Sequence, residues 1–255
     1  MAKPNGTETL ERGHIYFLYR PRVENENPAG VGDIQRLYVV LSPAEKERYR
    51  LAVLGTKRLP QASQEGAERN WGFIEMVRKK PQSITKELKA ATYKTKTRGE
   101  RQRPAARPLG EGVYRILRHG DHTHLVYALE LPEKPGEPQR QMHVDQEASY
   151  IISIKNPAKG SPKNAGLSGG RQARYPRKLM QVFEDKRFAD ADPPEFLDHE
   201  GAEFVLVAAS EDIQEELGIR LDTQHETQSS ADMFKDLHLD RSKHPVKPLF
   251  TGEWA

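Results

Sequence analysis

The chain has 255 residues, a formal net charge of +3 and no cysteine. The lack of cysteine excludes disulfides and thiolate metal ligands, and it fits the reducing cytoplasm, where we expect the protein to be located. Only 36% of the residues are hydrophobic while 30% are charged, so we expect one or two small globular units with many loops, no signal peptide and no membrane span.

The first part of the chain predicts three strands, because three short segments are rich in aromatic and β-branched residues. They are residues 14–20 (HIYFLYR), 36–41 (RLYVVL) and 49–54 (YRLAVL). A helix is predicted over residues 65–80, where apolar side chains recur every three or four residues and Pro81 follows. The order of elements in this part is therefore β-β-β-α.

The second part of the chain repeats that order. Its predicted strands are residues 113–117, 123–131 and 149–154, and an amphipathic helix is predicted over 174–185. We therefore predict an α+β fold with mixed or antiparallel sheets, built by internal duplication of a β-β-β-α unit with pseudo-twofold symmetry. The two halves, residues 11–108 and 111–209, would pack as one globular unit, because neither buries enough apolar surface alone.

Residues 210–255 differ in character from the rest of the chain. Ser210 is a predicted N-cap of a short helix, and the polar residues that follow predict a largely flexible C-terminal extension. Leu249, Phe250 and Trp254 are the apolar side chains of its last part. Side chains of this kind also occur in short motifs that bind a partner, so this tail has two interpretations.

Charge is distributed unevenly along the chain. From Arg78 to Arg107 there are eleven Lys and Arg against two Glu, a balance of +9, and from Glu184 to Asp240 there are seventeen Asp and Glu against four Lys and Arg, a balance of −13. The basic segment Lys94–Arg107 is a candidate surface for nucleic acid, another polyanion or an acidic protein. Alternatively, it pairs with the acidic part of the same chain. The basic binding candidates are Lys94, Lys96, Arg98, Arg101 and Arg103.

Three histidines lie close together at His119, His122 and His124. On a strand, His122 and His124 would point to one face, as in a two-histidine metal site. A lone H-x-H has little specificity, and no third ligand is selected by its spacing, so we interpret these residues as turn and strand residues and predict no metal.

Residues 166–172 contain two further motif matches. They fit G-x-S-x-G and also the LSGGRQ signature of transporter ATPases. A nucleophile serine needs a strand before it, and the ATPase signature needs a phosphate-binding loop upstream; neither is present in this sequence. We interpret both matches as coincidences in a loop, and we predict no cofactor.

Three separated motifs carry a resemblance to a known family. A T-x-G-x-R-x-x-P-x-A-x-P-x-G-E-G-V-Y segment ends at Tyr114, an H-L-x-Y-x-L-x-x-P strand begins at His124, and a K-N-P turn begins at Lys155. With these motifs in order, residues 11–209 resemble a widespread uncharacterised protein family of bacteria and fungi. The resemblance implies no activity. Some fungal relatives carry a BTB domain transcription factor label, but this sequence has no BTB pattern, so the label is not carried over.

These observations predict a cytoplasmic, non-enzymatic binding or protein-interaction module. The alternative is nucleic-acid or polyanion binding through Lys94–Arg107. A second alternative is an enzyme with a site between the two halves near Arg101, Glu111 and His124. Glu111, Tyr114 and His124 complete the set of candidate binding residues, because they lie at the seam between the predicted halves and on the strands beside it.

Overall fold

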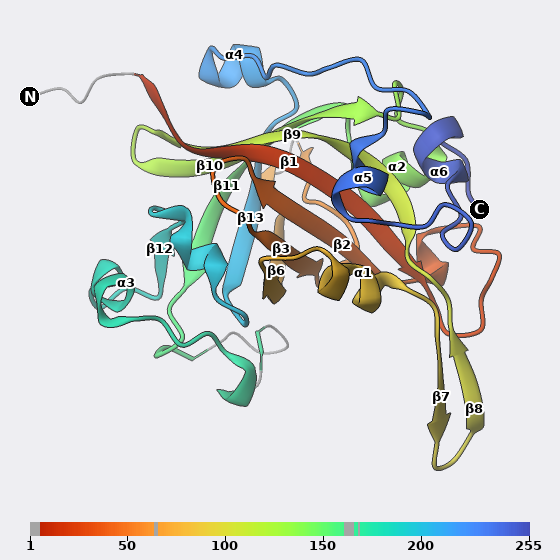
Figure 1. The fold of residues 1–255 in the computed structure, drawn as a ribbon. Coiled ribbons are helices and arrows are strands. Elements are labelled where there is room, and N and C mark those ends of the chain that lie inside the picture. Colours follow the sequence, from red (N-terminus) through yellow and green to blue (C-terminus); the bar gives the residue numbers. More distant parts are fainter. Residues whose placement is uncertain (1–5, 64–65, 161–165, 168) are drawn as a thin grey trace, which may run out of the picture.

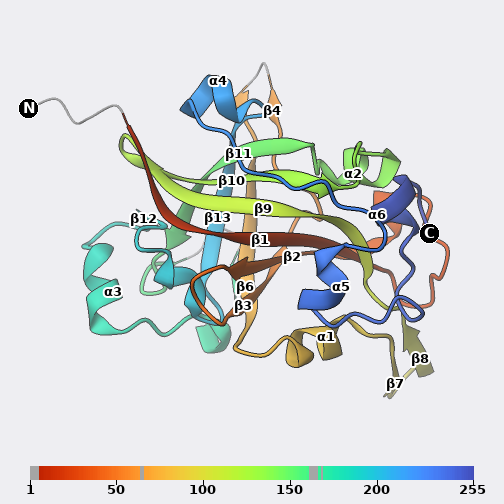
Figure 2. The same ribbon diagram turned by 45° about the horizontal axis from the view of Figure 1, so that its top comes forward.

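The computed structural model describes residues 6–63, 66–160, 166–167 and 169–255. Eight strands form a closed antiparallel barrel (Figures 1 and 2). In order around the barrel they are β1 (Thr7–Pro21), β2 (Ile34–Pro43), β3 (Tyr49–Leu54), β6 (Arg69–Arg78), β13 (Glu203–Ser210), β11 (Glu147–Lys155), β10 (His122–Leu131) and β9 (Arg107–His119). The pairing of β10 with β11, from His124 opposite Ile151 to Ala128 opposite Glu147, completes the ring.

The predicted α+β fold is wrong, because the described part of the chain is mostly β-structure. Its helices are short: α1 (Gln82–Leu88), α2 (Glu137–Met142), α3 (Arg177–Val182), α4 (Ile213–Leu217), α5 (Asp232–Asp236) and α6 (Lys247–Thr251). Three 3₁₀ turns are Val31–Asp33, Gly169–Arg171 and Pro194–Asp198, and two short strands, β4 (Ala62–Ser63) and β5 (Gly66–Ala67), form a separate pair.

The predicted β-β-β-α unit is wrong for the same reason. The helix expected over 65–80 contains strand β6, in which Asn70, Gly72 and Ile74 are buried at every second position. That burial has the period of a strand, and β3 and β13 flank β6 with ladder hydrogen bonds. Each part of the chain instead contributes four consecutive strands, β1-β2-β3-β6 and β9-β10-β11-β13, to a single barrel.

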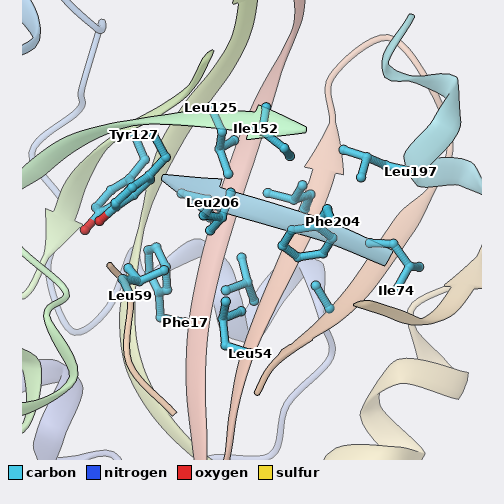
Figure 3. A pocket seen from close by; sticks show the side chains of 15 residues that line it. Phe17, Leu54, Leu59, Ile74, Leu125, Tyr127, Ile152, Leu197, Phe204 and Leu206 are labelled. Atoms are coloured by element: carbon cyan, nitrogen blue, oxygen red, sulfur yellow. The ribbon is translucent and has the colours of Figure 1, made fainter. Parts of the chain in front are cut away.

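The barrel interior is a packed apolar core. Alternate residues of the strands point inward, including Phe17, Leu54, Tyr127 and Phe204 (Figure 3). The void among these side chains has a volume of only about 20 Å³, and the hydroxyl of Tyr127 points away from it (Figure 3). This volume is close to that of one water molecule, so the described interior does not hold an organic ligand without rearrangement.

Gly112 marks a close approach between two barrel strands. A Cβ atom at this position would lie 2.1 Å from the carbonyl oxygen of Ala128 on β10. Such a distance is far below van der Waals contact, so a side chain there would force β9 and β10 apart. The glycine-rich sequence around Glu111 is therefore explained by strand packing.

The C-terminal part of the chain covers the outside of the barrel. Met233, Leu237 and Leu239, in and after α5, pack against Tyr16 and Tyr38 on the outer face. Figures 1 and 2 show this part, with α4, α5 and α6, crossing over β9 and β1. We expected a short helix and a largely flexible extension over 210–255; the short helix is α4, and the mobility stays a prediction. None of the described helices is both long and apolar enough to cross a membrane.

Candidate nucleic-acid interface

A two-stranded arm carries five of the predicted site residues. Its strands, β7 (Ala91–Thr95) and β8 (Gly99–Arg103), form a separate sheet that projects away from the barrel (Figures 1 and 2). Tyr93 lies opposite Arg101, and Lys94 lies opposite Glu100. Because side chains alternate along a strand, Tyr93 and Arg101 share one face of the arm while Lys94 lies on the other.

Arg20, at the end of β1, fixes both ends of the arm to the barrel. Its side chain is fully buried, and its Nη1 donates hydrogen bonds to the carbonyl oxygens of Lys89, 3.2 Å away, and Pro104. Its Nη2 donates to the carbonyl oxygen of Glu87 at 2.5 Å, and its Nε donates to the Tyr38 hydroxyl at 3.2 Å. Since Lys89 precedes the arm and Pro104 follows it, one guanidinium group holds both segments where they leave the barrel.

The basic residues nearest the barrel are paired with carboxylates. Arg101 lies 2.6 Å from Glu24, and Arg103 lies 3.1 Å from Glu87. These ion pairs are only partly exposed, so they help to hold the arm in place while reducing its positive charge near the barrel.

The basic residues further along the arm are not held in ion pairs in the described structure, although Glu100 lies opposite Lys94 in the ladder. Lys94, Lys96 and Arg98 are exposed, and within the described ranges no carboxylate forms an ion pair with any of them. Tyr93 is also exposed, with 42% of its surface accessible. The end of the arm therefore presents three cations and one aromatic ring to solvent.

The ion pairs also test whether the acidic C-terminal region neutralises the basic segment. In the described structure, Glu200 of this region pairs with Arg78 at the start of the basic stretch, while Asp192 pairs with Arg118, Asp222 with Arg115 and Asp240 with Lys243. Ion pairs of the basic segment involve Glu24, Glu26 and Glu87 instead. Neutralisation of the arm by the acidic region is thus not seen in the described ranges.

Glu111 lies on the outer face of β9 beneath α5, away from the arm. Its carboxylate accepts hydrogen bonds from the backbone N–H groups of Asp232, at 3.2 Å, and Met233, at 2.8 Å. Burial raises the pKa of Glu111 to about 7, and the charges of Glu226 and Asp232 add to the shift while the two backbone hydrogen bonds oppose it. Glu111 thus holds the beginning of α5 on the barrel.

Tyr114 belongs to a buried polar network at one end of the barrel. Its hydroxyl donates a hydrogen bond to Glu11 Oε1 at 2.9 Å. Arg50 donates to both carboxylate oxygens of Glu11, at 2.5 and 2.9 Å, and through Nε to Asp198 at 2.7 Å. Burial raises the pKa of Tyr114 well above its usual value, and the Glu11 charge acts in the same direction. Because its charges compensate one another internally, this network has the character of a structural element.

His124 is buried on the outer face of β10. Its Nδ1 lies 3.0 Å from Ser149 Oγ and 3.7 Å from Glu216 Oε1. Burial lowers the pKa of His124 to about 4, assisted by the neighbouring imidazoles of His119 and His122. The ring is 3% exposed, so a substrate does not reach it in this structure.

The structure does not bring Arg101, Glu111 and His124 together. Arg101 lies on the projecting arm, while Glu111 and His124 lie on the barrel wall. His124 pairs with Leu117 on β9, and Leu117 is six residues further along that strand than Glu111, a distance of about 20 Å. A common site between the two halves therefore has no geometric support.

The residues that fix the arm were not found by sequence reasoning. Arg20 and Glu24 contact the arm or its ends from a distant part of the chain, Glu87 contacts it from α1 just before the arm, and no local pattern marks them. In the described ranges no three His, Asp or Glu residues form a metal-binding group. Ser168, from the G-x-S-x-G match, lies outside the described residues.

Comparison of the chain with known protein families, with curated proteins and with solved structures finds no match.

Proposed function

We propose that this protein is a non-enzymatic binding module of the cytoplasm that holds the phosphate backbone of nucleic acid on its β7–β8 arm. The observation that carries the proposal is the exposed positive charge of Lys94, Lys96 and Arg98, which exceeds that of the arm's one carboxylate, Glu100, on an arm that projects from the barrel. The lack of cysteine supports the choice of compartment.

The physical basis is electrostatic. Exposed Lys and Arg side chains bind phosphates mainly by releasing counterions from the nucleic acid, and this contribution does not depend on base sequence. The buried Arg20 and the pairs Arg101–Glu24 and Arg103–Glu87 fix the orientation of the arm, so less conformational freedom is lost on binding. A two-stranded ribbon also has a width that the major groove of a duplex admits.

Direct binding tests the proposal. Fluorescence anisotropy of labelled duplex DNA, single-stranded DNA and RNA of equal length would be measured with the full chain and with a variant carrying Lys94→Ala, Lys96→Ala and Arg98→Ala. We expect the wild-type chain to bind at least one of them, and the arm variant to bind it much more weakly.

A matched variant controls for net charge. The control replaces Lys134, Lys178 and Lys235, which are exposed lysines away from the arm, by Ala. It removes the same number of positive charges as the arm variant. We expect this control to bind like the wild type. Equal loss in the control and arm variants, or no binding to any of the three nucleic acids, would contradict the proposal.

A further inference from the structure

The two faces of the β7–β8 arm differ in what they contact. One face carries Tyr93, Arg101 and Arg103, and carboxylates from outside the arm pair with both arginines. Because side chains alternate along each strand and cross-strand partners share a face, the other face is made of different residues. This polar face consists of two cross-strand pairs, Thr92 with Gln102 and Lys94 with Glu100.

The polar face is open to solvent, and all four of its side chains are exposed. The side-chain hydrogen bonds and ion pairs of the described arm involve Thr95, Arg101 and Arg103, which lie on the opposite face. The backbone behind the polar face is held, because the carbonyl oxygen of Gln102 accepts a hydrogen bond from the Glu24 N–H at 2.9 Å. The polar face is therefore unoccupied on a fixed backbone, which lowers the cost of ordering it when it binds.

Glu100 distinguishes the polar face from a surface that only follows phosphates. A carboxylate beside Lys94 repels phosphate groups, so it would weaken binding to a nucleic-acid backbone. In the major groove of DNA, by contrast, a carboxylate accepts a hydrogen bond from the N4 amino group of cytosine, and an amide such as Gln102 fits N6 and N7 of adenine. A carboxylate and an amide on one exposed face, behind cations at the end of the arm, favour contact with base edges.

The dimensions of the arm fit that groove. Each strand of the arm has five residues, which span about 17 Å and would face about five base pairs of a duplex. The major groove of B-form DNA is about 12 Å wide and admits a two-stranded ribbon. The arm projects from the barrel (Figure 1), so its polar face can lie along the groove. The major groove of an RNA duplex is too deep and narrow for side chains to read.

We propose that the nucleic acid bound by the arm is B-form DNA, and that the polar face lies in its major groove with Glu100 and Gln102 contacting base edges. This inference rests on the proposed function of the arm. Lys94, at the side of the ribbon, would contact the flanking phosphates, which set the position of the protein without carrying sequence information. Stacking of unpaired bases is disfavoured, because Tyr93 is the arm's one aromatic residue.

Competition among nucleic acids tests the proposal. Duplex DNA that binds the full chain would be enriched from a pool of random sequences. The enriched duplex would then be compared by fluorescence anisotropy with a scrambled DNA duplex, an RNA duplex of the enriched sequence and one of its single DNA strands. We expect the enriched DNA duplex to bind at least about tenfold more tightly than each of the other three.

Two variants identify the side chains that contact bases. Gln102→Ala should lose about tenfold in affinity for the enriched duplex and little for the scrambled one. Replacing adenine by 7-deazaadenine in the enriched duplex removes N7 from the major groove, so it should weaken binding by the wild type but not by this variant. Glu100→Gln should bind every duplex more tightly, because a repulsive charge is lost, while discriminating less between sequences.

A matched control separates the position of Glu100 from its charge. Glu133 is an exposed carboxylate outside the arm, and Glu133→Gln makes the same change in net charge. We expect this variant to prefer the enriched duplex over the scrambled one by the same factor as the wild type.

The possible failures are distinguishable. The absence of binding to any nucleic acid would overturn both the proposed function and this inference. Three results would overturn this inference alone: equal affinity for the enriched and scrambled duplexes, an RNA duplex or a single strand bound as tightly as the enriched DNA duplex, or wild-type discrimination in Gln102→Ala and Glu100→Gln variants that are folded by circular dichroism.

Discussion

Arg20 and Lys89 are 69 residues apart in the chain, yet Nη1 of Arg20 donates a hydrogen bond to the carbonyl oxygen of Lys89 at 3.2 Å. The same nitrogen also donates to Pro104, so the two ends of the β7–β8 arm are joined through one buried side chain. The arm is therefore fixed by the barrel and not only by its own turn, which explains how a two-stranded sheet can project without support along its length.

Replacing Arg20 by Ala should destabilise the protein by about 3 kcal/mol, because the buried carbonyl oxygen of Pro104 and the partly buried ones of Glu87 and Lys89 lose their donor. Urea unfolding measures the change. Arg36→Ala is the control: Arg36 forms a partly exposed ion pair with Glu75, and its loss should cost about 1 kcal/mol or less. Similar losses for the two variants would show that Arg20 has no special role in the fold.

Arg50→Leu should be more damaging, with a loss of about 3 to 5 kcal/mol, because Glu11 and Asp198 would keep buried charges without their main partner. Urea unfolding at neutral pH again gives the change. Arg48 also pairs with Asp198 but is 33% exposed, so Arg48→Leu should have a much smaller effect. An Arg50→Leu variant as stable as Arg48→Leu would contradict the structural role assigned to the network around Tyr114.

Ionisation of Glu111 should lower the free energy of unfolding as the pH rises from about 4.5 to 7. Its pKa is raised from 4.5 to about 7 in the folded state, so the fold favours the protonated carboxyl. The contribution of this protonation to the free energy of unfolding is complete below the unfolded-state pKa, and it is lost as the pH rises through the folded-state pKa. The total effect is about 3 kcal/mol.

Glu111→Gln removes this titration while keeping an oxygen that accepts the Met233 N–H. The difference in unfolding free energy between wild type and variant should therefore change between pH 4.5 and 7.5, with the wild type losing stability relative to the variant at the higher pH. A difference that is constant over this range would mean that Glu111 titrates normally. His14 lies 3.8 Å from Asp232, so His14→Gln should be measured in parallel.

His124 should have the opposite effect. Its folded-state pKa is lowered to about 4 from 6.5, so the neutral ring is favoured by the fold, and stability is lost as the pH falls from about 6.5 towards 4. The imidazole Cε1 proton, followed by NMR, should titrate near pH 4. A His124 midpoint near 6.5, the usual histidine pKa, would contradict the assigned burial.

The strands were largely predictable from the sequence, while the way they close was not. Residues 14–20, 36–41, 49–54, 113–117, 123–131 and 149–154 all lie within strands of the barrel, because aromatic and β-branched residues are concentrated there. Trp71, Ile74 and Val77 recur at helical spacing and so predict a helix over 65–80, whereas tertiary pairing with β3 and β13 makes β6 a strand. Barrel closure depends on the pairing of β10 with β11 and of β1 with β9, which local patterns do not encode.

The candidate site was predictable only in part. The charge of Lys94, Lys96 and Arg98 is visible in the sequence, but their separation from the acidic region depends on long-range packing. Glu111, Tyr114 and His124 were grouped because they lie near one another along the chain. Strand geometry and register separate them, since Tyr114 points into the barrel while Glu111 and His124 lie on its outer face.

The salt dependence of nucleic-acid binding tests the role of the arm most directly. Each phosphate neutralised by Lys or Arg contributes about 0.9 to the slope of log affinity against log salt for duplex DNA. If Lys94, Lys96 and Arg98 each contact a phosphate, the slope should be shallower by about 2 to 3 in the triple Ala variant, and unchanged in the variant that lacks Lys134, Lys178 and Lys235. An unchanged slope in the arm variant would contradict the central claim that the β7–β8 arm holds the phosphate backbone.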